Sequence, residues 1–466
     1  MSQLRSNQRT FISLTGRLGR GFRCNSAPCS AHSEEEKMKL RNFAIASALI
    51  VASISGASAQ ETTLKFWTWH PSEPVLNKII DGFEQENLGV EVELQLFESG
   101  AYQDRLPLAL ASGDELDIVA VQTSTMVELV KDQLAPIEPL FDEYGSMPIT
   151  DLLSESAIGQ GKTLASDREL YIAPMGVLGS VVAYYNMDLM NELGLAIPRD
   201  RADLQNLVEV TTAKRPDLVP VSFTGAGWFL DEISTTIAEQ VSPGFFNSVR
   251  YNEGGRWDDT TYLTAFGALV DLYKDGIFSK DTLDLDYGRS VELFQQGQAV
   301  MFLQGSWESG VLSAPFREAN GVKLENVSAS ALPTIEPNTE HSVRAFIEVG
   351  LAVPNASDHK ELATKFVEYV VAGNGVDAWS DTLFVVPSKV GFELADDIFS
   401  TDEARRGYNE ISHLLLNPGS HRNNVSDFSN VVGDTIVASI IGETDYSEQV
   451  KYLQREWESG RYSNAE

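Results

Sequence analysis

The sequence predicts an α/β protein whose strands form open sheets. Three observations predict this class. Near-continuous apolar runs, such as 116–121 and 299–303, are typical of strands buried on both faces. Other stretches place apolar residues at the spacing of an amphipathic helix. Strands and helices of this length alternate along the chain, which favours helices packed on a sheet.

The first elements are expected in the order strand, helix, strand, helix, strand. The run 63–68 is apolar and aromatic and is bounded by polar residues, so we expect a strand there. Apolar residues within 75–83 recur at helical spacing. Apolar and polar residues alternate over 90–96, which predicts a strand with one buried face. A second helix is expected over 102–111, followed by the buried strand 116–121.

The same alternation continues towards the C-terminus, where the chain becomes mostly helical. The sequence contains no repeat and no low-complexity tract. By the same spacing rules, we expect strands at 181–185, 299–303 and 349–353 and helices at 204–213, 232–240, 263–274, 291–296, 359–371, 431–441 and 448–457.

Residues 38–59 have the features of a secretory signal peptide. Positively charged residues after Met38 precede a short apolar stretch, and Ala57-Ser58-Ala59 forms a small-residue cleavage site. The apolar stretch is too short and too rich in Ala and Ser for a membrane span. No cysteine follows the cleavage point. We therefore expect a soluble periplasmic protein without a lipid anchor.

Residues 1–37 need a separate interpretation, because a signal peptide would not work behind a leader of this length. The segment is rich in Arg and contains no acidic residue before Glu34, a composition that resembles an organelle transit peptide. We interpret it instead as an over-called N-terminal extension, with translation starting at Met38.

Charge and cysteine content exclude several classes of protein. The 466-residue chain carries 35 Lys and Arg against 67 Asp and Glu, which argues against a nucleic-acid binder because phosphate contacts need basic surfaces. Residues 1–59 hold eight of the basic and three of the acidic residues, so their removal would deepen the net charge from -32 to -37. Both cysteines, Cys24 and Cys29, would be lost with them, leaving an exported chain without thiols.

Five short motifs occur in order along residues 62–460. They are LKFWTW at 64–69, LASGDELDIV at 110–119, AYYNMD at 183–188, FQQGQAVM at 294–301 leading into GSW at 305–307, and KELATKFVEY at 360–369. Each motif alone is weak, but their order and spacing resemble the extracellular solute-binding proteins of ABC sugar importers, the group that includes maltose-binding protein.

This resemblance implies a two-lobed periplasmic-binding-protein fold of type II, with a ligand cleft between the lobes. Three chain crossings would form the hinge, near 177–182, 346–349 and 383–387. Hinge closure around a ligand is a common motion of such folds. The implied division is 60–178 plus 348–384 for lobe one and 182–346 plus 388–466 for lobe two.

In lobe one, four candidate ligand contacts follow predicted strands at their carboxyl ends, where an open sheet places ligands. The resemblance implies that Trp69 and His70 touch the ligand, whereas Trp67 is expected to pack. Gln122 and Thr123 lie in a loop that supplies hydrogen bonds to sugar hydroxyls in the family, and a Gln amide offers both a donor and an acceptor. Alternatively, these polar residues cap the next helix.

Trp228 and Trp307 are the candidate stacking residues of lobe two. Sugar rings have apolar C–H faces that pack on aromatic rings. Trp228 follows a glycine-rich loop that lacks the lysine of a phosphate loop, and its alternative role is to anchor that loop. Trp307 matches the most recognisable stacking residue of the family, and Ser306 before it is a good helix N-cap.

Four further residues are candidate ligand contacts. Glu348 interrupts an apolar crossing, where relatives often have a small residue and where a charge is costly unless it is paired. It could accept hydrogen bonds from two sugar hydroxyls or pair with Arg344. Tyr102, Phe384 and Arg422 are weaker candidates, placed before a helix, at the third crossing and in a polar loop, respectively.

These features predict the substrate-binding component of an ABC transporter, which captures a sugar or oligosaccharide and delivers it to the membrane permease. We expect a monomer without metal, cofactor or enzymatic activity. One alternative is the same fold binding another small polar or cationic solute, and another is a ligand-sensing partner of a receptor. A secreted glycosidase would need two positioned carboxylates, but no nucleophile elbow, zinc-ligand helix or paired-Cys motif accompanies the acidic residues.

Overall fold

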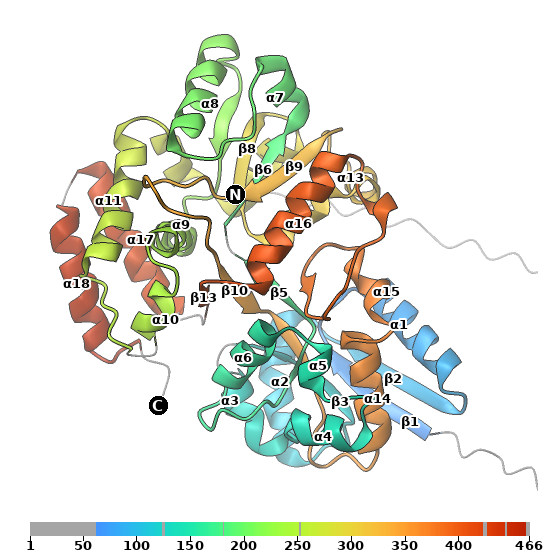
Figure 1. The fold of residues 1–466 in the computed structure, drawn as a ribbon. Helices are drawn as coiled ribbons and strands as arrows, with labels where there is room; N and C mark the ends of the chain where they lie inside the picture. The colour runs from blue at the N-terminus through green and yellow to red at the C-terminus, as the bar shows by residue number, and fades with distance from the viewer. Residues whose placement is uncertain are drawn as a thin grey trace, which may run out of the picture. The chain divides into compact units, whose positions relative to one another are not determined.

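The computed structural model describes residues 62–123, 126–179, 181–250, 253–422, 426–442 and 445–462. The predicted extension and signal peptide lie outside the described residues. The described residues belong to one compact unit, which contains three sheets flanked by helices (Figure 1). The predicted α/β class is therefore confirmed. No helix in these ranges is long and apolar enough to cross a membrane.

The first sheet has five strands in the order β2-β1-β3-β11-β4. β1 (Thr62–Thr68) lies parallel to β2 (Val90–Leu96) and to β3 (Ile118–Gln122). In contrast, β11 (Val349–Ala352) is antiparallel to β3 and to the short β4 (Ala173–Pro174). The strands expected from sequence in this region are present, but the sheet is mixed.

Amphipathic helices pack on this sheet. α1 (Glu73–Glu86) buries Leu76, Ile79, Ile80 and Phe83, which lie on one helical face. α2 (Ser99–Ser112) begins where Glu98 caps it by accepting a hydrogen bond from the Ala101 N–H, and ends at Gly113 in the left-handed conformation. The others are α3 (Met126–Val130), α4 (Ile137–Tyr144), α5 (Ile149–Leu152), α6 (Glu155–Thr163), α14 (Lys360–Val371) and α15 (Val376–Ser380).

A second sheet has the order β7-β8-β6-β9. β6 (Val182–Asn186) is antiparallel to both β8 (Ala299–Gln304) and β9 (Val327–Ala331), whereas β7 (Val219–Ser222) is parallel to β8. The sequence predicted β6 and β8 because the runs 181–185 and 299–303 contain only apolar and aromatic residues. It missed β7, which contains a Pro, and β9, whose Ser and Ala residues lack a strong strand preference.

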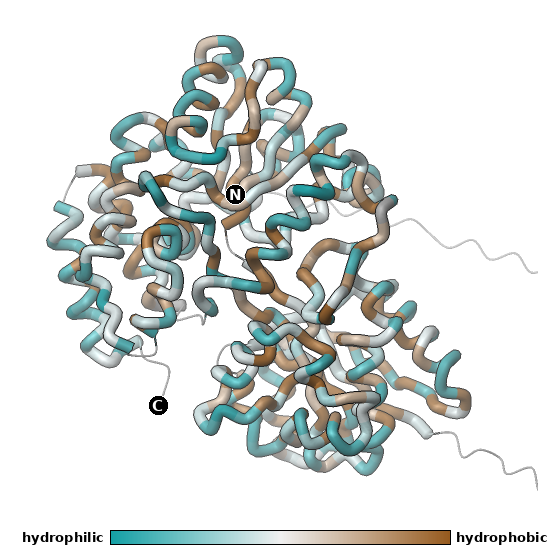
Figure 2. Tube along the Cα trace, in the orientation of Figure 1, coloured by the Kyte–Doolittle hydropathy of each residue, from teal (hydrophilic) through white to brown (hydrophobic). Residues whose placement is uncertain are grey.

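The helices around the second sheet include α9 (Gly227–Val241), which is buried along most of its length. α9 begins five residues before the expected start at 232, so Trp228 lies in its first helical turn and not in a loop. The start was missed because no side chain caps it. The other helices are α7 (Met187–Leu193), α8 (Arg201–Lys214), α10 (Phe245–Arg250), α11 (Thr260–Lys274), α12 (Tyr287–Gln295), α13 (Ala314–Asn320), α16 (Asp402–Leu416), α17 (Ser426–Ile441) and α18 (Tyr446–Glu458). Figure 2 shows hydrophilic and hydrophobic residues interspersed along the outer helices, as expected when one face is buried.

A small third sheet has the order β12-β5-β10-β13. β5 (Gly176–Gly179) pairs with β12 (Val386–Pro387) on one side and with β10 (Arg344–Ile347) on the other, and β10 also pairs with β13 (Ser420–His421). β5 connects β4 of the first sheet to β6 of the second, and β10 leads from β9 directly into β11. The three expected crossing regions thus overlap strands that are hydrogen-bonded to one another.

Candidate ligand-binding site

The predicted site residues form two groups that are joined by the segment from β10 to β11. This segment contains Phe346, Ile347 and Glu348 and contacts both groups. The first group lies at the carboxyl ends of β1 and β3, with Tyr102 of α2 and Phe384 packed against the residues there. It comprises Trp69, His70, Tyr102, Gln122, Thr123 and Phe384. The second group comprises Trp228, Trp307 and Arg422.

Trp69 is half-buried, and its ring rests on Tyr102, with ring centroids 5.1 Å apart. Tyr102 itself is only 1% exposed. Its hydroxyl lies 2.6 Å from the backbone carbonyl oxygen of Ala120, which accepts its hydrogen bond. The structure therefore leaves Tyr102 no accessible surface for the predicted ligand contact. Its ring instead packs against the ring of Trp69 and supports it.

His70 and Phe384 lie ring against ring, with centroids 4.7 Å apart. Both side chains are half-buried. Burial lowers the pKa of His70 to about 4, so the imidazole is neutral at pH 7. Thr68 holds this segment in place, because its hydroxyl donates to the His70 carbonyl oxygen at 2.6 Å. The pair offers an aromatic surface and a neutral ring nitrogen.

Gln122 and Glu348 form a hydrogen bond between the end of β3 and the crossing. The amide nitrogen of Gln122 donates to Oε1 of Glu348 at 2.9 Å, and the amide oxygen accepts from Gln103. The alternative pairing of Glu348 with Arg344 is wrong, because Arg344 bonds to Glu232 at 2.6 Å instead. Glu348 is half-buried, and its carboxylate can accept further hydrogen bonds.

Thr123 connects the end of β3 to the same crossing. Its hydroxyl donates to the carbonyl oxygen of Ile347, and its backbone N–H donates to that of Glu348 at 3.2 Å. Thr123 is 8% exposed. Because its donor is already used, Thr123 serves in this structure to fix the crossing, and the predicted donation to a sugar hydroxyl is unsupported.

Trp228 and Trp307 lie close together, with ring centroids 6.2 Å apart and planes at 43°. Trp307 is held by its indole N–H, which donates to the Tyr287 hydroxyl at 3.2 Å. That hydroxyl in turn donates to Glu308. Burial raises the pKa of both Glu308 and Tyr287. The orientation of Trp307 is thus set by a hydrogen-bond chain that leaves its ring half-buried.

The expectation that Ser306 caps a helix is wrong. Gly305 is the N-cap residue of the short 3₁₀ helix Ser306–Leu312. The Ser306 hydroxyl accepts a hydrogen bond from the Gly179 N–H at 2.9 Å. This backbone N–H lies at the end of β5 and is buried, so leaving it unpaired would be costly. The tertiary contact outweighs the local capping preference.

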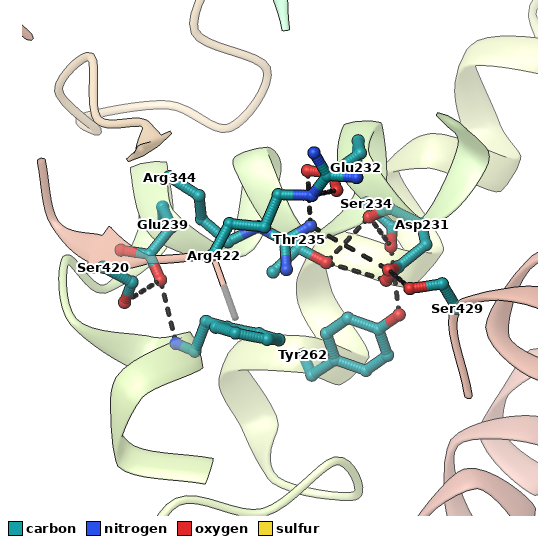
Figure 3. Close-up of polar contacts among 11 residues, drawn as sticks. Asp231, Glu232, Ser234, Thr235, Glu239, Tyr262, Arg344, Ser420, Arg422 and Ser429 are labelled. Carbon is teal, nitrogen blue, oxygen red and sulfur yellow. Dashed lines mark hydrogen bonds and ion pairs between the residues drawn. The ribbon is translucent and has the colours of Figure 1, made fainter. Parts of the chain in front are cut away.

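Arg422 lies in a buried cluster of charges around α9 (Figure 3). Its Nε is 2.5 Å from Oε1 of Glu232, and its guanidinium carbon lies 4.5 Å from the ring centroid of Phe346. Arg344 bonds to the same Glu232. Burial raises the pKa of the neighbouring Asp231. Protein groups thus occupy two sides of the Arg422 guanidinium. The predicted role of Arg422 as a ligand contact stays a prediction.

Sequence reasoning missed several residues that shape this site. Tyr287 and Phe346 gave no local signal, since each resembles an ordinary aromatic residue at the edge of an element. Glu232 could have been flagged, because it and Asp231 follow the apolar residues 228–230 at the start of a predicted helix, where an unpaired carboxylate would be costly. Within the described ranges, no group of three or more His, Cys, Asp or Glu side chains is arranged to hold a metal ion.

Residues 69–372 match the family model described as bacterial extracellular solute-binding protein. The chain belongs to this family. The match covers four of the five motifs in full and Trp69, the last residue of the first motif. It confirms the resemblance on which the fold and the site were predicted.

Other solute-binding proteins are similar over most of the chain. The fructooligosaccharide ABC transporter substrate-binding protein FusA of Streptococcus pneumoniae is 22% identical over 394 residues, which cover 77% of this chain and 68% of FusA. The apo form of RafE from Streptococcus pneumoniae has a TM-score of 0.66 and 17% identity, covering 86% of this chain and 98% of RafE. Maltose-bound MalE3 of T. maritima has a TM-score of 0.61 and 16% identity, covering 85% of this chain and 99% of MalE3. The two structures support the two-lobed solute-binding fold.

Proposed function

We propose that this protein is the substrate-binding component of an ABC transporter and that it captures a sugar or oligosaccharide for delivery to a membrane permease. The observation that carries the proposal is the aromatic corner formed by Trp228 and Trp307. It belongs to the same connected set of residues as the Gln122–Glu348 hydrogen bond. Similarity to FusA and to a maltose-bound structure supports a saccharide ligand.

The chemistry of the two groups is complementary to that of a sugar. Indole rings pack on the apolar C–H faces of a pyranose or furanose, whereas the hydroxyl edges need hydrogen-bond partners. Glu348 and Gln122 supply acceptor and donor atoms, and Trp69 supplies a further ring. His70 and Phe384 would border the same ligand.

Two lobes would close around this ligand. Lobe one comprises 60–178 plus 348–384, and lobe two comprises 182–346 plus 388–466. This division keeps all strands of the five-stranded sheet in lobe one and all strands of the β7-β8-β6-β9 sheet in lobe two. The hinge would consist of β5, the β10–β11 segment and the segment before β12, since these segments join the two sets of strands.

The protein would act in the periplasm as a soluble monomer, after removal of a signal peptide at 38–59. Binding and release would be its whole cycle, without catalysis and without a cofactor, and hydrolysis of ATP would belong to the transporter. The thiol-free and acidic mature chain inferred from the sequence is consistent with export.

Calorimetric titration of the purified protein with mono-, di- and oligosaccharides tests the proposal. A bound saccharide should also change tryptophan fluorescence and raise the melting temperature, since ligand at about a thousandfold excess over Kd adds roughly 4 kcal/mol of stability. Hydrolysis of a saccharide during the titration would contradict a pure binding role. If no saccharide binds and a solute of another class does, the proposal of a saccharide ligand is wrong.

One observation favours a second candidate, which is a small cationic solute. Glu348 is half-buried, and the described residues place no Lys, Arg or His side chain in a salt bridge with it. An ammonium group would compensate this charge, as would a pair of hydroxyl donors. Titration with an amino sugar and its neutral parent sugar at low and high salt separates the two, because the attraction of an ammonium group is weakened by salt.

A further inference from the structure

Arg422 joins three segments that are far apart in the sequence. Its backbone N–H donates to the carbonyl oxygen of Ala345 in β10 at 2.8 Å. Its Nε lies 2.5 Å from Glu232 in α9, and its guanidinium covers one face of Phe346 at 4.5 Å. The side chain is only 12% exposed. Arg422 is thus held by a backbone bond, an ion pair and a ring contact at once. Figure 3 shows Arg422 beside Glu232, its ion-pair partner.

The ion pair with Glu232 connects Arg422 to Trp228. Glu232 follows Trp228 by four residues in α9, so the two side chains lie on the same side of the helix, one turn apart. The side chain of Glu232 is 2% exposed, accepts a hydrogen bond from Arg344 and forms an ion pair with Arg422. These ion pairs fix the first turns of α9 against β10, and they fix the position of Trp228 with them.

The contact with the Phe346 ring connects Arg422 to Trp307. The ring of Phe346 lies between the Arg422 guanidinium and Trp307, with a centroid distance of 6.4 Å and an interplanar angle of 63° to the latter. Arg422 therefore supports Phe346, which packs edge-on against Trp307. Arg422 is therefore connected to Trp228 through Glu232 and to Trp307 through Phe346.

We propose that Arg422 is a positioning residue that sets the geometry of Trp228 and Trp307 without touching the ligand. The inference rests on the proposed function, since it assigns the corner to ligand binding. Arginine suits this role because its planar group bonds to a carboxylate along its edge and stacks on a ring with its face. A lysine at this position keeps the charge but cannot stack in the same way.

The test compares ligand affinity and dissociation rate in Arg422→Lys and Arg422→Met. We expect Arg422→Met to bind the saccharide about tenfold more weakly, with a faster dissociation rate, and Arg422→Lys to lie between it and the wild type. Arg256→Met is the matched control, because Arg256 is an exposed arginine that also contacts two carboxylates, Asp258 at 2.8 Å and Glu458 at 3.0 Å. Its affinity should match that of the wild type.

A second variant guards against loss of folding, since removal of Arg422 alone leaves Glu232 with one cation fewer. The pair Arg422→Met with Glu232→Gln removes both charges and should recover much of the melting temperature. Its affinity should stay low, because the support of Phe346 is still missing. Recovery of both the melting temperature and the affinity would overturn the positioning role.

A double-mutant cycle with Trp307→Ala separates positioning from direct contact. If Arg422 acts through the corner, Arg422→Met should weaken binding much less in the Trp307→Ala background than in the wild type. Fully multiplicative effects would indicate an independent contact with the ligand and would overturn the proposal. So would an Arg422→Met variant whose melting temperature falls while its affinity is unchanged.

The ligand-free protein provides a readout that does not depend on the proposed function. Acrylamide quenching that is attributable to Trp307, measured as the difference from a Trp307→Phe version of each protein, should increase in Arg422→Met. If no saccharide binds the wild type, the proposed function fails while this measurement still tests the support of Trp307. Equal quenching of Trp307 in the wild type and in Arg422→Met would overturn the positioning role of Arg422.

Discussion

The rings of Trp228 and Trp307 lie with their centroids 6.2 Å apart and their planes at 43°. One residue comes from the first turn of α9 and the other from the 3₁₀ helix that follows β8. The two indoles therefore form adjoining walls, which a flat or slightly puckered ring can contact on two sides.

Replacing Trp307 with Ala should weaken saccharide binding by about 2 kcal/mol or more, since buried aromatic anchors contribute most to binding. Calorimetry measures the change. Trp457→Ala is the matched control, because Trp457 is a half-buried indole that packs on Trp257 and Phe428. The control should lower the melting temperature and leave the affinity unchanged. An unaltered affinity in Trp307→Ala would remove this residue from the site.

Replacing Gly305 with Ala should also weaken binding, and it should lower the free energy of unfolding by about 1–3 kcal/mol, the range for overpacking. Gly305 has φ of -72°, which Ala adopts without strain, but the added Cβ would lie 2.2 Å from a ring atom of Trp307. The ring must therefore move. Gly159→Ala is the control, because a Cβ there meets nothing within 4 Å and lies in helix α6. If Gly305→Ala binds like the wild type, the observed position of Trp307 is not required.

Replacing Glu348 with Gln tests the charge at the crossing. For a neutral sugar we expect a loss of about 1 kcal/mol, because a carboxylate accepts stronger hydrogen bonds than an amide. A cationic solute should lose more, and its binding to the wild type should weaken with salt. The control is Glu361→Gln, which removes an exposed carboxylate paired with Lys365. It should change neither the affinity for a neutral sugar nor that for a cationic solute. Tighter binding in Glu348→Gln would contradict both ligand classes.

The stability of the protein should fall as the pH drops from about 6.5 towards 4. Burial lowers the pKa of both His70 and His421 to about 4, whereas an unfolded histidine titrates near 6.5. In this window the unfolded chain binds more protons, so the histidine contribution to stability is complete above about 6.5 and is lost as the pH falls. Each histidine contributes a slope of up to about 1.4 kcal/mol per pH unit.

Buried carboxyl groups titrate with the opposite sign, so the measurement has to be a difference. Burial raises the pKa of Asp231, Glu239 and Glu308, and stability from these groups increases as the pH falls. Chemical denaturation at several pH values should therefore give a shallower loss for the His70→Gln/His421→Gln double variant than for the wild type. Equal slopes would show that neither imidazole is kept neutral by burial.

Much of the fold was predictable because its signals are local. The apolar runs of β3 and β8 and the helical spacing in α1 and α14 can be recognised from residues within one element. The orientation of β11 could not be predicted, since an apolar run has the same appearance in a parallel and an antiparallel strand. The start of α9 was missed because no capping side chain marks it.

The sequence by itself determined the alternation of strands and helices, the family motifs and the two tryptophans of the aromatic corner, because each depends on residue type and short-range spacing. Only the tertiary structure decided which groups pair. Glu348 bonds to Gln122, 226 residues away, and not to Arg344, and Tyr102 uses its hydroxyl on a backbone carbonyl. Such choices depend on which buried polar groups packing brings within hydrogen-bond distance, and no local pattern encodes that distance.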